Sequence, residues 1–299
     1  MRHTLRLAIA VLGLSLLAAS AAFAEGNDTP FSWKVGTMEV IQLVDAEGEI
    51  NTDILLGASP GQIERYVPKG TGSSVNAFLL RTPGRVMLVD AGFGQRIFGE
   101  LESLGIAPEA VNAVLLTHMH VDHISGLLRD GKPAFPNAQI FVSEAEKAYW
   151  TDTAIMAGKP EPEQKAFKLP QAVVAAYEGR ISAFAPGTLK KPAPLFPGIK
   201  SIAAYGHTLG HSMFLLESEG NKLLIWGDLT HVTNLQAAVP TVAVTYDIDP
   251  AQAVETRKEV LAHVAANNIP VAGMHVSRPA MGRIKAVGEG SYSFTPLGE

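Results

Sequence analysis

The chain has 299 residues, nine histidines and no cysteine, and its formal net charge is −5. Apolar residues make up 47% of it, enough to offset the ordering entropy of a packed core, which excludes a disordered chain. The lack of cysteine excludes disulfide scaffolds, thiolate zinc sites, iron–sulfur clusters and cysteine nucleophiles, and the acidic balance disfavours a nucleic-acid groove.

The first 24 residues have the layout of a secretory signal peptide. A short basic region with Arg2 and Arg6 precedes an apolar run over 7–18. Ala22-Phe23-Ala24 then matches a small-x-small cleavage site. The run is short for a membrane-spanning helix, so we expect cleavage and no stable membrane insertion afterwards. The sequence therefore predicts a periplasmic or secreted protein whose mature part, residues 25–299, forms one domain.

The first half of the mature chain is predicted to alternate between strands and helices. Short apolar runs, several of them rich in β-branched residues, predict strands over 35–44, 77–80, 85–90, 114–117 and 139–142. The Pro83-Gly84 turn predicts a hairpin between the second and third of these strands. Helices are predicted over 95–104 and from Ser143, where Glu146 completes a capping-box pattern.

The second half begins with residues 158–198, rich in Pro, Lys and Ala, which we interpret as an insertion or lid with one helix over 164–177. Strands are predicted over 200–204, 213–217, 222–226 and 271–274, with a turn at 219–221. Asp249-Pro250 provides an N-cap and a first-turn proline for a helix to Asn267. Hairpins bracketed by helices suggest an α/β sandwich, although periodicity alone does not choose its topology.

Four residues of metal-ligand type fall within the six positions of HMHVDH (118–123), directly after the predicted strand 114–117. Alternate side chains of an extended backbone point the same way, so His118 and His120 can converge on one ion. Asp122 and His123 follow beyond the turn, where they can face a neighbouring ion. Imidazole and carboxylate ligands suit zinc, and also iron, manganese or cobalt.

Three further candidate ligands also follow predicted strands. His207 lies in GHTLGH (206–211), Asp228 in a Gly-Asp pair after the strand 222–226, and His275 after the strand 271–274. Loops held by a rigid scaffold are where functional side chains gather. The repeated placement predicts that these residues join the first cluster in one metal site.

In this order and at these intervals, HMHVDH, GHTLGH, the Gly-Asp pair and the His275 segment resemble the metallo-β-lactamase superfamily over nearly the whole mature chain. More narrowly, AFPNA (134–138) and FPGIK (196–200) resemble the methyl parathion hydrolase branch, which lies close to the acyl-homoserine lactonases. The resemblance implies a four-layer αββα sandwich (the metallo-β-lactamase fold) that holds two divalent metal ions, zinc first and manganese, cobalt or iron as alternatives. It implies that the first ion is bound by His118, His120 and His207, the second by Asp122, His123 and His275, and that Asp228 bridges the pair.

Two close cations lower the pKa of a shared water, so such a site predicts a hydrolase that uses a metal-bridging hydroxide. Asp228 and Asp122 are its candidate catalytic carboxylates. A serine hydrolase is disfavoured because the sequence has no G-x-S-x-G motif. The favoured substrate is a small ester-like molecule, above all a lactone of the acyl-homoserine lactone type. The alternatives are a phosphotriester hydrolase, a β-lactamase as a weaker one, and a non-catalytic metal-binding scaffold on the same fold.

Three residues near the predicted ligands have open or supporting roles. Asp90 is either a hydrogen-bond partner of a ligand histidine or a turn residue, and His211 is assigned a structural role. His231 follows Asp228 by three positions and has no assigned function. Arg278 either orients an anionic or carbonyl group or is simply solvated.

The predicted partner is a small-molecule substrate and not nucleic acid, because the chain is acidic and its first residues predict export. Tyr149, Trp150 and Phe167 either line an aromatic pocket or, more commonly for such residues, pack in the core or in an oligomer contact. If they form an oligomer contact, residues 149–150 and the segment 158–198 would make the interface of a homodimer.

Overall fold

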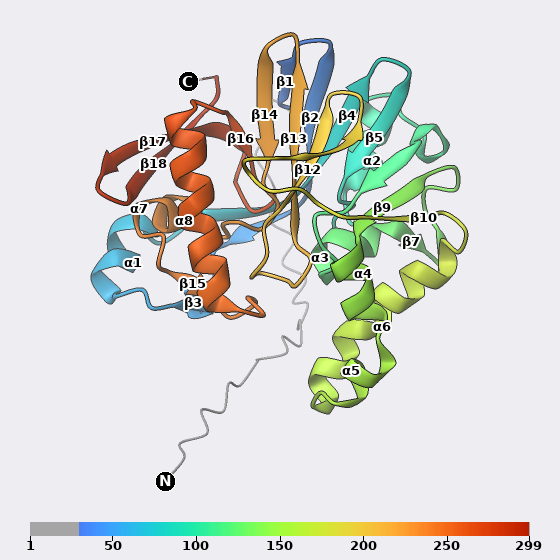
Figure 1. The fold of residues 1–299 in the computed structure, drawn as a ribbon, viewed down its shortest axis with the longest axis horizontal. Coiled ribbons are helices and arrows are strands. Elements are labelled where there is room, and N and C mark those ends of the chain that lie inside the picture. The colour runs from blue at the N-terminus through green and yellow to red at the C-terminus, as the bar shows by residue number, and fades with distance from the viewer. Residues whose placement is uncertain (1–29, 299) are drawn as a thin grey trace.

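The computed structural model describes residues 30–298 and contains two facing sheets with helices on their outer sides (Figure 1). The first sheet has the order β1 (Ser32–Val35), β2 (Met38–Glu49), β4 (Gly72–Thr82), β5 (Arg85–Val89), β6 (Ala113–Leu115), β9 (Gln139–Ser143), β10 (Ile181–Phe184). The second has the order β11 (Ala193–Phe196), β12 (Ile199–Ala203), β13 (Ser212–Ser218), β14 (Asn221–Ile225), β16 (Val271–Ala272), β17 (Met281–Gly288), β18 (Ser291–Pro296). The predicted signal peptide over 1–24 lies outside the described residues and stays a prediction.

Alternating apolar residues explain why the two sheets stack. In β13, Phe214 and Leu216 face the core between the sheets, whereas Met213 and Leu215 face the opposite side. Side chains on one strand point alternately to the two faces of a sheet, so a strand that is apolar on both faces must be covered on both. Both sheets therefore need an outer layer of helices.

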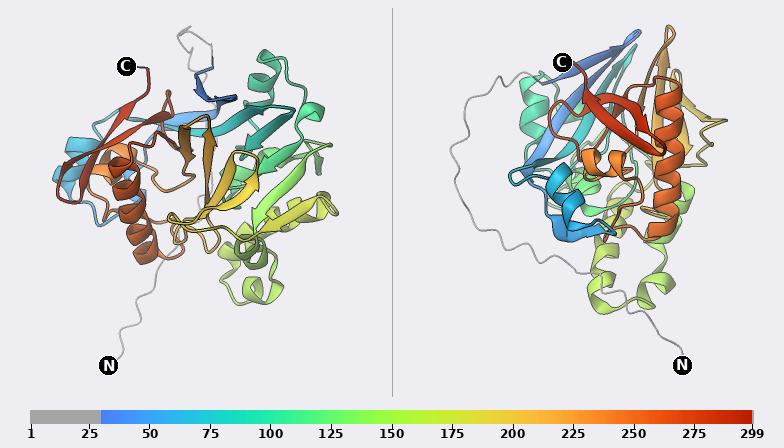
Figure 2. Two further views of the ribbon diagram at one scale, coloured as in Figure 1. Left: turned by 45° about the horizontal axis from the view of Figure 1, so that its top comes forward. Right: turned by 90° about the vertical axis from the view of Figure 1, so that its left-hand side faces the viewer.

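Helices supply that outer layer and complete the four layers (Figure 2). The helices are α1 (Pro60–Tyr66), α2 (Ile97–Ser103), α3 (Val121–Ile124), α4 (Glu144–Thr151), α5 (Thr153–Ala157), α6 (Glu161–Ala176), α7 (Thr233–Ala238) and α8 (Pro250–Ala266). Ile97 of α2 and Phe167 of α6 are buried against the first sheet. Val260 and Val264 of α8 are buried against the second. The predicted αββα sandwich is thus confirmed.

Local sequence signals placed most elements correctly. The Pro83-Gly84 turn joins the antiparallel strands β4 and β5, and Gly84 has the positive φ of 77° that the third position of a type II turn requires. The Asp249 side chain accepts a hydrogen bond from the Gln252 backbone N–H at 3.0 Å, so it caps α8 as predicted. The predicted strands and hairpins of the second half correspond to β12–β14 and β16.

The interpretation of residues 158–198 as an insertion or lid was wrong. Helix α6 buries Phe167 and Val173 in the core of the first sheet. Strand β10 pairs in parallel with β9, and β11 pairs with β12 at the edge of the second sheet. The segment is integral to both sheets, and its apolar residues at helical spacing, rather than its Pro and Lys content, decided where it packs.

Several short elements had no strong sequence signal. Helices α1 and α7 pack together, and the β17–β18 hairpin closes the second sheet. Two short pairs, β3 (Leu55–Leu56) with β15 (Ala243–Val244) and β7 (Leu128–Arg129) with β8 (Lys132–Pro133), and the 3-10 turns at Thr52–Ile54, Pro108–Ala110 and Ser125–Leu127 complete the described chain. Between residues 30 and 298, no helix combines the length and apolarity needed to cross a membrane.

Parallel strand pairing places most of the loops that carry candidate ligand residues at one edge of the two sheets. Strands β5, β6 and β9 run parallel in the first sheet, and β14 and β16 run parallel in the second. The carboxyl ends of parallel strands meet at the same edge of a sheet, which is where α/β proteins build their sites. The loops after β6, β14 and β16 carry six of the seven predicted ligand residues, and His207 lies in the loop after β12, which joins the antiparallel pair β12 and β13.

Candidate metal centre

The histidine-rich segment changes direction within a few residues, and this change separates its side chains. His120 has an extended backbone and is the N-cap residue of the short helix α3, which contains Asp122 and His123. His118 and His120 therefore precede the helix, while Asp122 and His123 belong to its first turn. One segment of six residues thus supplies ligand-type atoms to two neighbouring positions.

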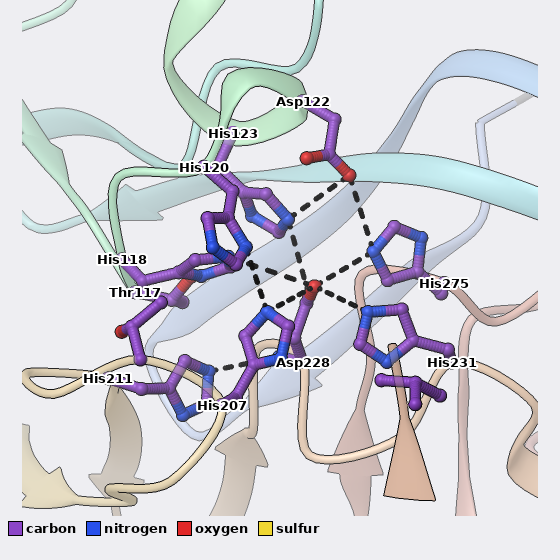
Figure 3. A network of polar contacts seen from close by, with 12 residues as sticks. Thr117, His118, His120, Asp122, His123, His207, His211, Asp228, His231 and His275 are labelled. Atoms are coloured by element: carbon purple, nitrogen blue, oxygen red, sulfur yellow. Dashed lines mark hydrogen bonds and ion pairs between the residues drawn. The ribbon is translucent and has the colours of Figure 1, made fainter. Parts of the chain in front are cut away.

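The structure brings all seven predicted ligand residues together (Figure 3). They form two groups whose candidate ligand atoms lie within 4.8 Å of one another: His118, His120 and His207 in one, and Asp122, His123, Asp228 and His275 in the other. The grouping matches the two sets that the sequence predicts. Metal binding by these residues stays a prediction.

Asp228 lies between the two groups. Its Oδ2 atom is 3.4 Å from His207 Nε2 in the first group and 3.0 Å from His275 Nε2 in the second. Its Oδ1 atom is 3.3 Å from His123 Nε2. A carboxylate has two oxygens that can each bind a cation, so this position suits a bridging ligand.

Unpartnered buried atoms at this centre favour a cation site. His118 Nε2, His123 Nε2 and Asp228 Oδ1 are buried and have no hydrogen-bond partner within residues 30–298. Leaving such atoms unpaired away from water costs free energy, and native proteins rarely do so without a ligand. Divalent ions held by imidazole nitrogen and carboxylate oxygen would satisfy all three atoms, and zinc, manganese, cobalt and iron accept this set.

The remaining ring nitrogens are held from behind, which fixes how the histidines point. Asp90 Oδ2 lies 2.7 Å from His123 Nδ1, and Asp247 Oδ1 lies 2.8 Å from His207 Nδ1. His275 Nδ1 lies 3.1 Å from a backbone carbonyl oxygen. Each contact leaves Nε2 free to face the centre, as carboxylate partners of metal-binding histidines do. Of the two roles left open for Asp90, the structure shows the contact with a candidate ligand histidine.

Electrostatics favour the protonation states that metal binding needs at His118, His120 and Asp228, but not at His123. Burial and neighbouring histidines lower the pKa of His118 and His120 well below the ordinary value, so both rings are neutral. Burial alone would raise the pKa of Asp228, but the surrounding histidines outweigh it and hold that pKa well below its usual range. Burial also opposes a charge on His123, yet the carboxylates around it raise its pKa. Metal binding would displace that proton.

His211 has the structural role that the sequence predicts. Its Nε2 accepts a hydrogen bond from the Asp228 backbone N–H at 3.0 Å, and its Nδ1 lies 2.9 Å from the Ala204 carbonyl oxygen. Burial and nearby His207 lower its pKa to about 3, so the ring stays neutral. Since both nitrogens are used, His211 positions the backbone of Asp228 and has no lone pair left for a metal.

His231 lies closer to the centre than the sequence indicated. Its Nε2 is 3.1 Å from Asp228 Oδ2, and its ring stacks on His275 with centroids 4.7 Å apart. Its backbone N–H donates to the Gln236 side chain at 2.6 Å, which fixes the loop after Asp228. A third candidate group of His207, Asp228 and His231 results from this position.

Glu146 joins the two histidine loops, a role that the sequence reasoning missed. Its carboxylate accepts hydrogen bonds from the Met119 and Gly210 backbone N–H groups, each at 2.9 Å. It also accepts from Trp150 Nε1 at 2.7 Å and Thr208 Oγ1 at 2.6 Å. Burial raises its pKa, but these four donors oppose that shift. The capping-box pattern had suggested that Glu146 turns back to Ser143. Only half of that box forms, because the carboxylate points inward instead.

Asp247 and Arg257 were also missed, because each acts across a long sequence separation. Asp247 contacts His207 forty positions away. Arg257, fully buried on α8, donates to the carbonyl oxygens of Leu229, Pro240 and Val242 and so holds the loop that contains His231. Burial lowers its pKa to about 10. Neither residue belongs to a local motif that could have identified it.

The three aromatic residues considered for a substrate pocket pack in the core instead. Trp150 and Phe167 are buried with ring centroids 4.9 Å apart, and Tyr149 packs against both. None of them lines the pocket beside the metal centre. Trp150 still contacts the site, because its ring lies edge-on to His120 at 5.7 Å.

A pocket of about 480 Å³ opens beside the centre. Its lining includes His231 and His275 together with apolar side chains such as Ile50, Val232 and Phe294. A pocket with apolar walls and a few polar groups is the usual form of a small-molecule site. One candidate ligand, His275, thus borders a space where a substrate can bind.

Comparisons with known proteins agree with this geometry. A family model described as the metallo-beta-lactamase superfamily matches residues 70–266. The crystal structure of hydrolase AbOPH of the beta lactamase superfamily has a TM-score of 0.83 at 28% identity and covers 90% of this chain and 98% of that one. AidC, a dizinc quorum-quenching lactonase, has a TM-score of 0.81 at 21% identity with the same coverage.

A curated relative matches over a shorter stretch. Exodeoxyribonuclease WalJ of Streptococcus pneumoniae is 42% identical over 64 residues, or 21% of this chain. The match spans 24% of the length of that relative. The family model, by contrast, covers more than half of the chain and includes six of the seven candidate ligands. The chain therefore belongs to the metallo-beta-lactamase superfamily of metal-dependent hydrolases.

Proposed function

We propose that this protein is a dinuclear metal-dependent hydrolase that opens a small lactone, of the acyl-homoserine lactone type. The observation that carries the proposal is the position of Asp228 between two groups of ligand atoms, with one buried imidazole nitrogen in each group and Asp228 Oδ1 itself left unpartnered. When bound there, two divalent ions would lower the pKa of a shared water and polarise the electrophilic oxygen of the substrate.

The chain's own residues would hold and orient the reacting groups. Asp228 would keep the two positions together and, with its free oxygen lone pairs, accept a hydrogen bond or proton from the attacking water. Asp122 lies 3.4 Å from His275 Nε2 and is partly exposed, so it can contact substrate or solvent. The backbone around both is fixed by Asp90, His211 and Glu146. Such preorganisation lets the site act without rearranging during the reaction.

The substrate class is supported by the pocket and by the neighbours. An acyl tail needs an apolar wall, and Ile50, Val232, Val276 and Phe294 provide one next to His231 and His275. The lactonase AidC was solved in complex with a product, N-hexanoyl-L-homoserine, and an AiiA variant of Bacillus thuringiensis was solved with N-decanoyl-L-homoserine bound at its active site. Both resemble this chain in fold.

A phosphotriester is the alternative substrate, because the same water can attack phosphorus and the same ions can stabilise the leaving oxygen. The test is a panel of a long-chain acyl-homoserine lactone, a paraoxon-type triester and a cephalosporin, assayed with metal-replete protein that lacks residues 1–24. We expect the highest kcat/KM on the lactone. A higher value on the triester or on the cephalosporin would replace the lactone assignment. Bound metal without turnover of any of them would favour the metal-binding scaffold.

A further inference from the structure

The pocket beside the metal centre has an uneven distribution of charge. Ionisable nitrogen comes from His231, His275 and Arg278, and none of the lining residues is an aspartate or glutamate. Arg278 is therefore the permanent charge of a pocket whose other walls are apolar or neutral.

Arg278 is free to bind a ligand. Within residues 30–298 its guanidinium has no ion pair, no hydrogen bond and no aromatic partner. By contrast, Arg81, Arg96 and Arg257 all have carboxylate or carbonyl partners. A guanidinium is charged at every physiological pH, and its planar fork pairs with carboxylate, sulfonate or phosphate through two parallel hydrogen bonds.

The backbone next to Arg278 is held in place relative to the metal centre. Buried Asn76 donates from its amide to the carbonyl oxygens of Met274 at 2.9 Å and Val276 at 2.8 Å, on either side of His275. The Ala280 backbone N–H donates to the Gln42 side chain at 3.0 Å, which fixes the other end of the turn. Arg278 thus belongs to a short segment anchored at both ends, three positions after a candidate metal ligand.

We propose that Arg278 makes this pocket select substrates whose side chain ends in an anionic group, while the reacting lactone lies at the metal centre. The proposal rests on the proposed function and adds the substrate class to it. The linker between the two ends would lie against Val232, Val276 and Phe294. The guanidinium of Arg278 can form two parallel hydrogen bonds with a terminal carboxylate, sulfonate or phosphate, which a neutral chain end cannot offer. A neutral acyl chain of the same length would leave Arg278 unpaired.

Binding separates this proposal from the hydrolytic activity. The probes are α,ω-dicarboxylates from succinate to sebacate, each compared with the monocarboxylate of the same carbon number, titrated calorimetrically into metal-loaded protein. In each pair of probes, both compounds have one carboxylate that can bind at the candidate metal centre. The difference between their affinities therefore measures the contribution of the second carboxylate. At the best chain length we expect the dicarboxylate to bind about tenfold more tightly than its partner. Arg278→Gln should remove that difference and leave the monocarboxylate affinity unchanged.

Lys285→Gln is the matched control, because it also removes one positive charge from an exposed position, on β17, outside the pocket lining. It should leave the affinity difference between dicarboxylate and monocarboxylate intact.

In turnover, a lactone with a carboxylate-terminated side chain should show a kcat/KM about tenfold above that of its methyl ester, and only Arg278→Gln should abolish this preference. Equal binding of the two probe classes by the unmodified protein, or equal effects of the two substitutions, would overturn the proposal. If no lactone is hydrolysed, the proposed function fails, and the binding pairs still decide the role of Arg278.

Discussion

Replacing Asp228 with asparagine is expected to lower kcat on the best substrate by more than about 100-fold and to reduce the bound metal. Changes in residues that merely orient a metal ligand already cost about 10- to 100-fold in affinity or activity. Asp228 lies between both ligand groups, so its loss should affect both positions at once. The asparagine amide would also place a donor where the free carboxylate oxygen lies. The measurements are kcat and the metal content of the purified variant.

His263→Ala is the control for that substitution. His263 lies in the last turn of α8, outside the candidate ligand groups, and is partly exposed. Its removal should leave kcat and metal content near those of the unmodified protein. Equal losses in the two variants would contradict the assignment of Asp228, because they would indicate a general loss of structure.

Glu146→Gln is expected to destabilise the protein by about 2–5 kcal/mol and to weaken metal binding. All four groups around this carboxylate donate hydrogen bonds, two to each oxygen. A glutamine amide keeps one acceptor oxygen and turns a donor toward the other two groups, whichever way it is oriented. Each buried donor left without an acceptor costs about 1–3 kcal/mol. Urea unfolding of the metal-free protein measures the first effect, and chelator competition measures the second.

Glu144→Gln provides the matched comparison, because Glu144 is in the first turn of the same helix but is exposed. That change should cost less than about 1 kcal/mol, the usual size of a charge effect at a helix end. If Glu146→Gln lowered stability but left metal affinity unchanged, Glu146 would be a core residue and not a link between the two histidine loops.

The sequence predicts the parts of this structure that depend on local signals. The hairpin strands can be recognised because they alternate in polarity or are apolar throughout. The two residues Asp249-Pro250 mark the start of helix α8. The candidate metal centre can equally be recognised in the sequence, because four of its residues lie within six positions and the others follow strands. The alternation of polar and apolar residues in strands, the 3.6-residue period of helices and these motifs can all be read within a few residues of sequence.

The parts that could not be predicted depend on contacts between distant segments. Asp247 follows no motif and reaches His207 only after the fold has formed. Glu146 fits a local capping pattern, but the burial of its helix end against both histidine loops gives its carboxylate stronger partners. Residues 158–198 were misjudged for a related reason, since an edge strand such as β10 is defined by the neighbour with which it pairs.

The most direct test of the account is the number of metal ions bound per chain. The protein, expressed with zinc or manganese supplied and freed of loosely bound metal, should be analysed by plasma mass spectrometry against its amino-acid content. The two ligand groups predict about two transition-metal ions per chain. Fewer than about one ion per chain, from protein that is folded by circular dichroism, would contradict the dinuclear site and the hydrolytic function proposed from it.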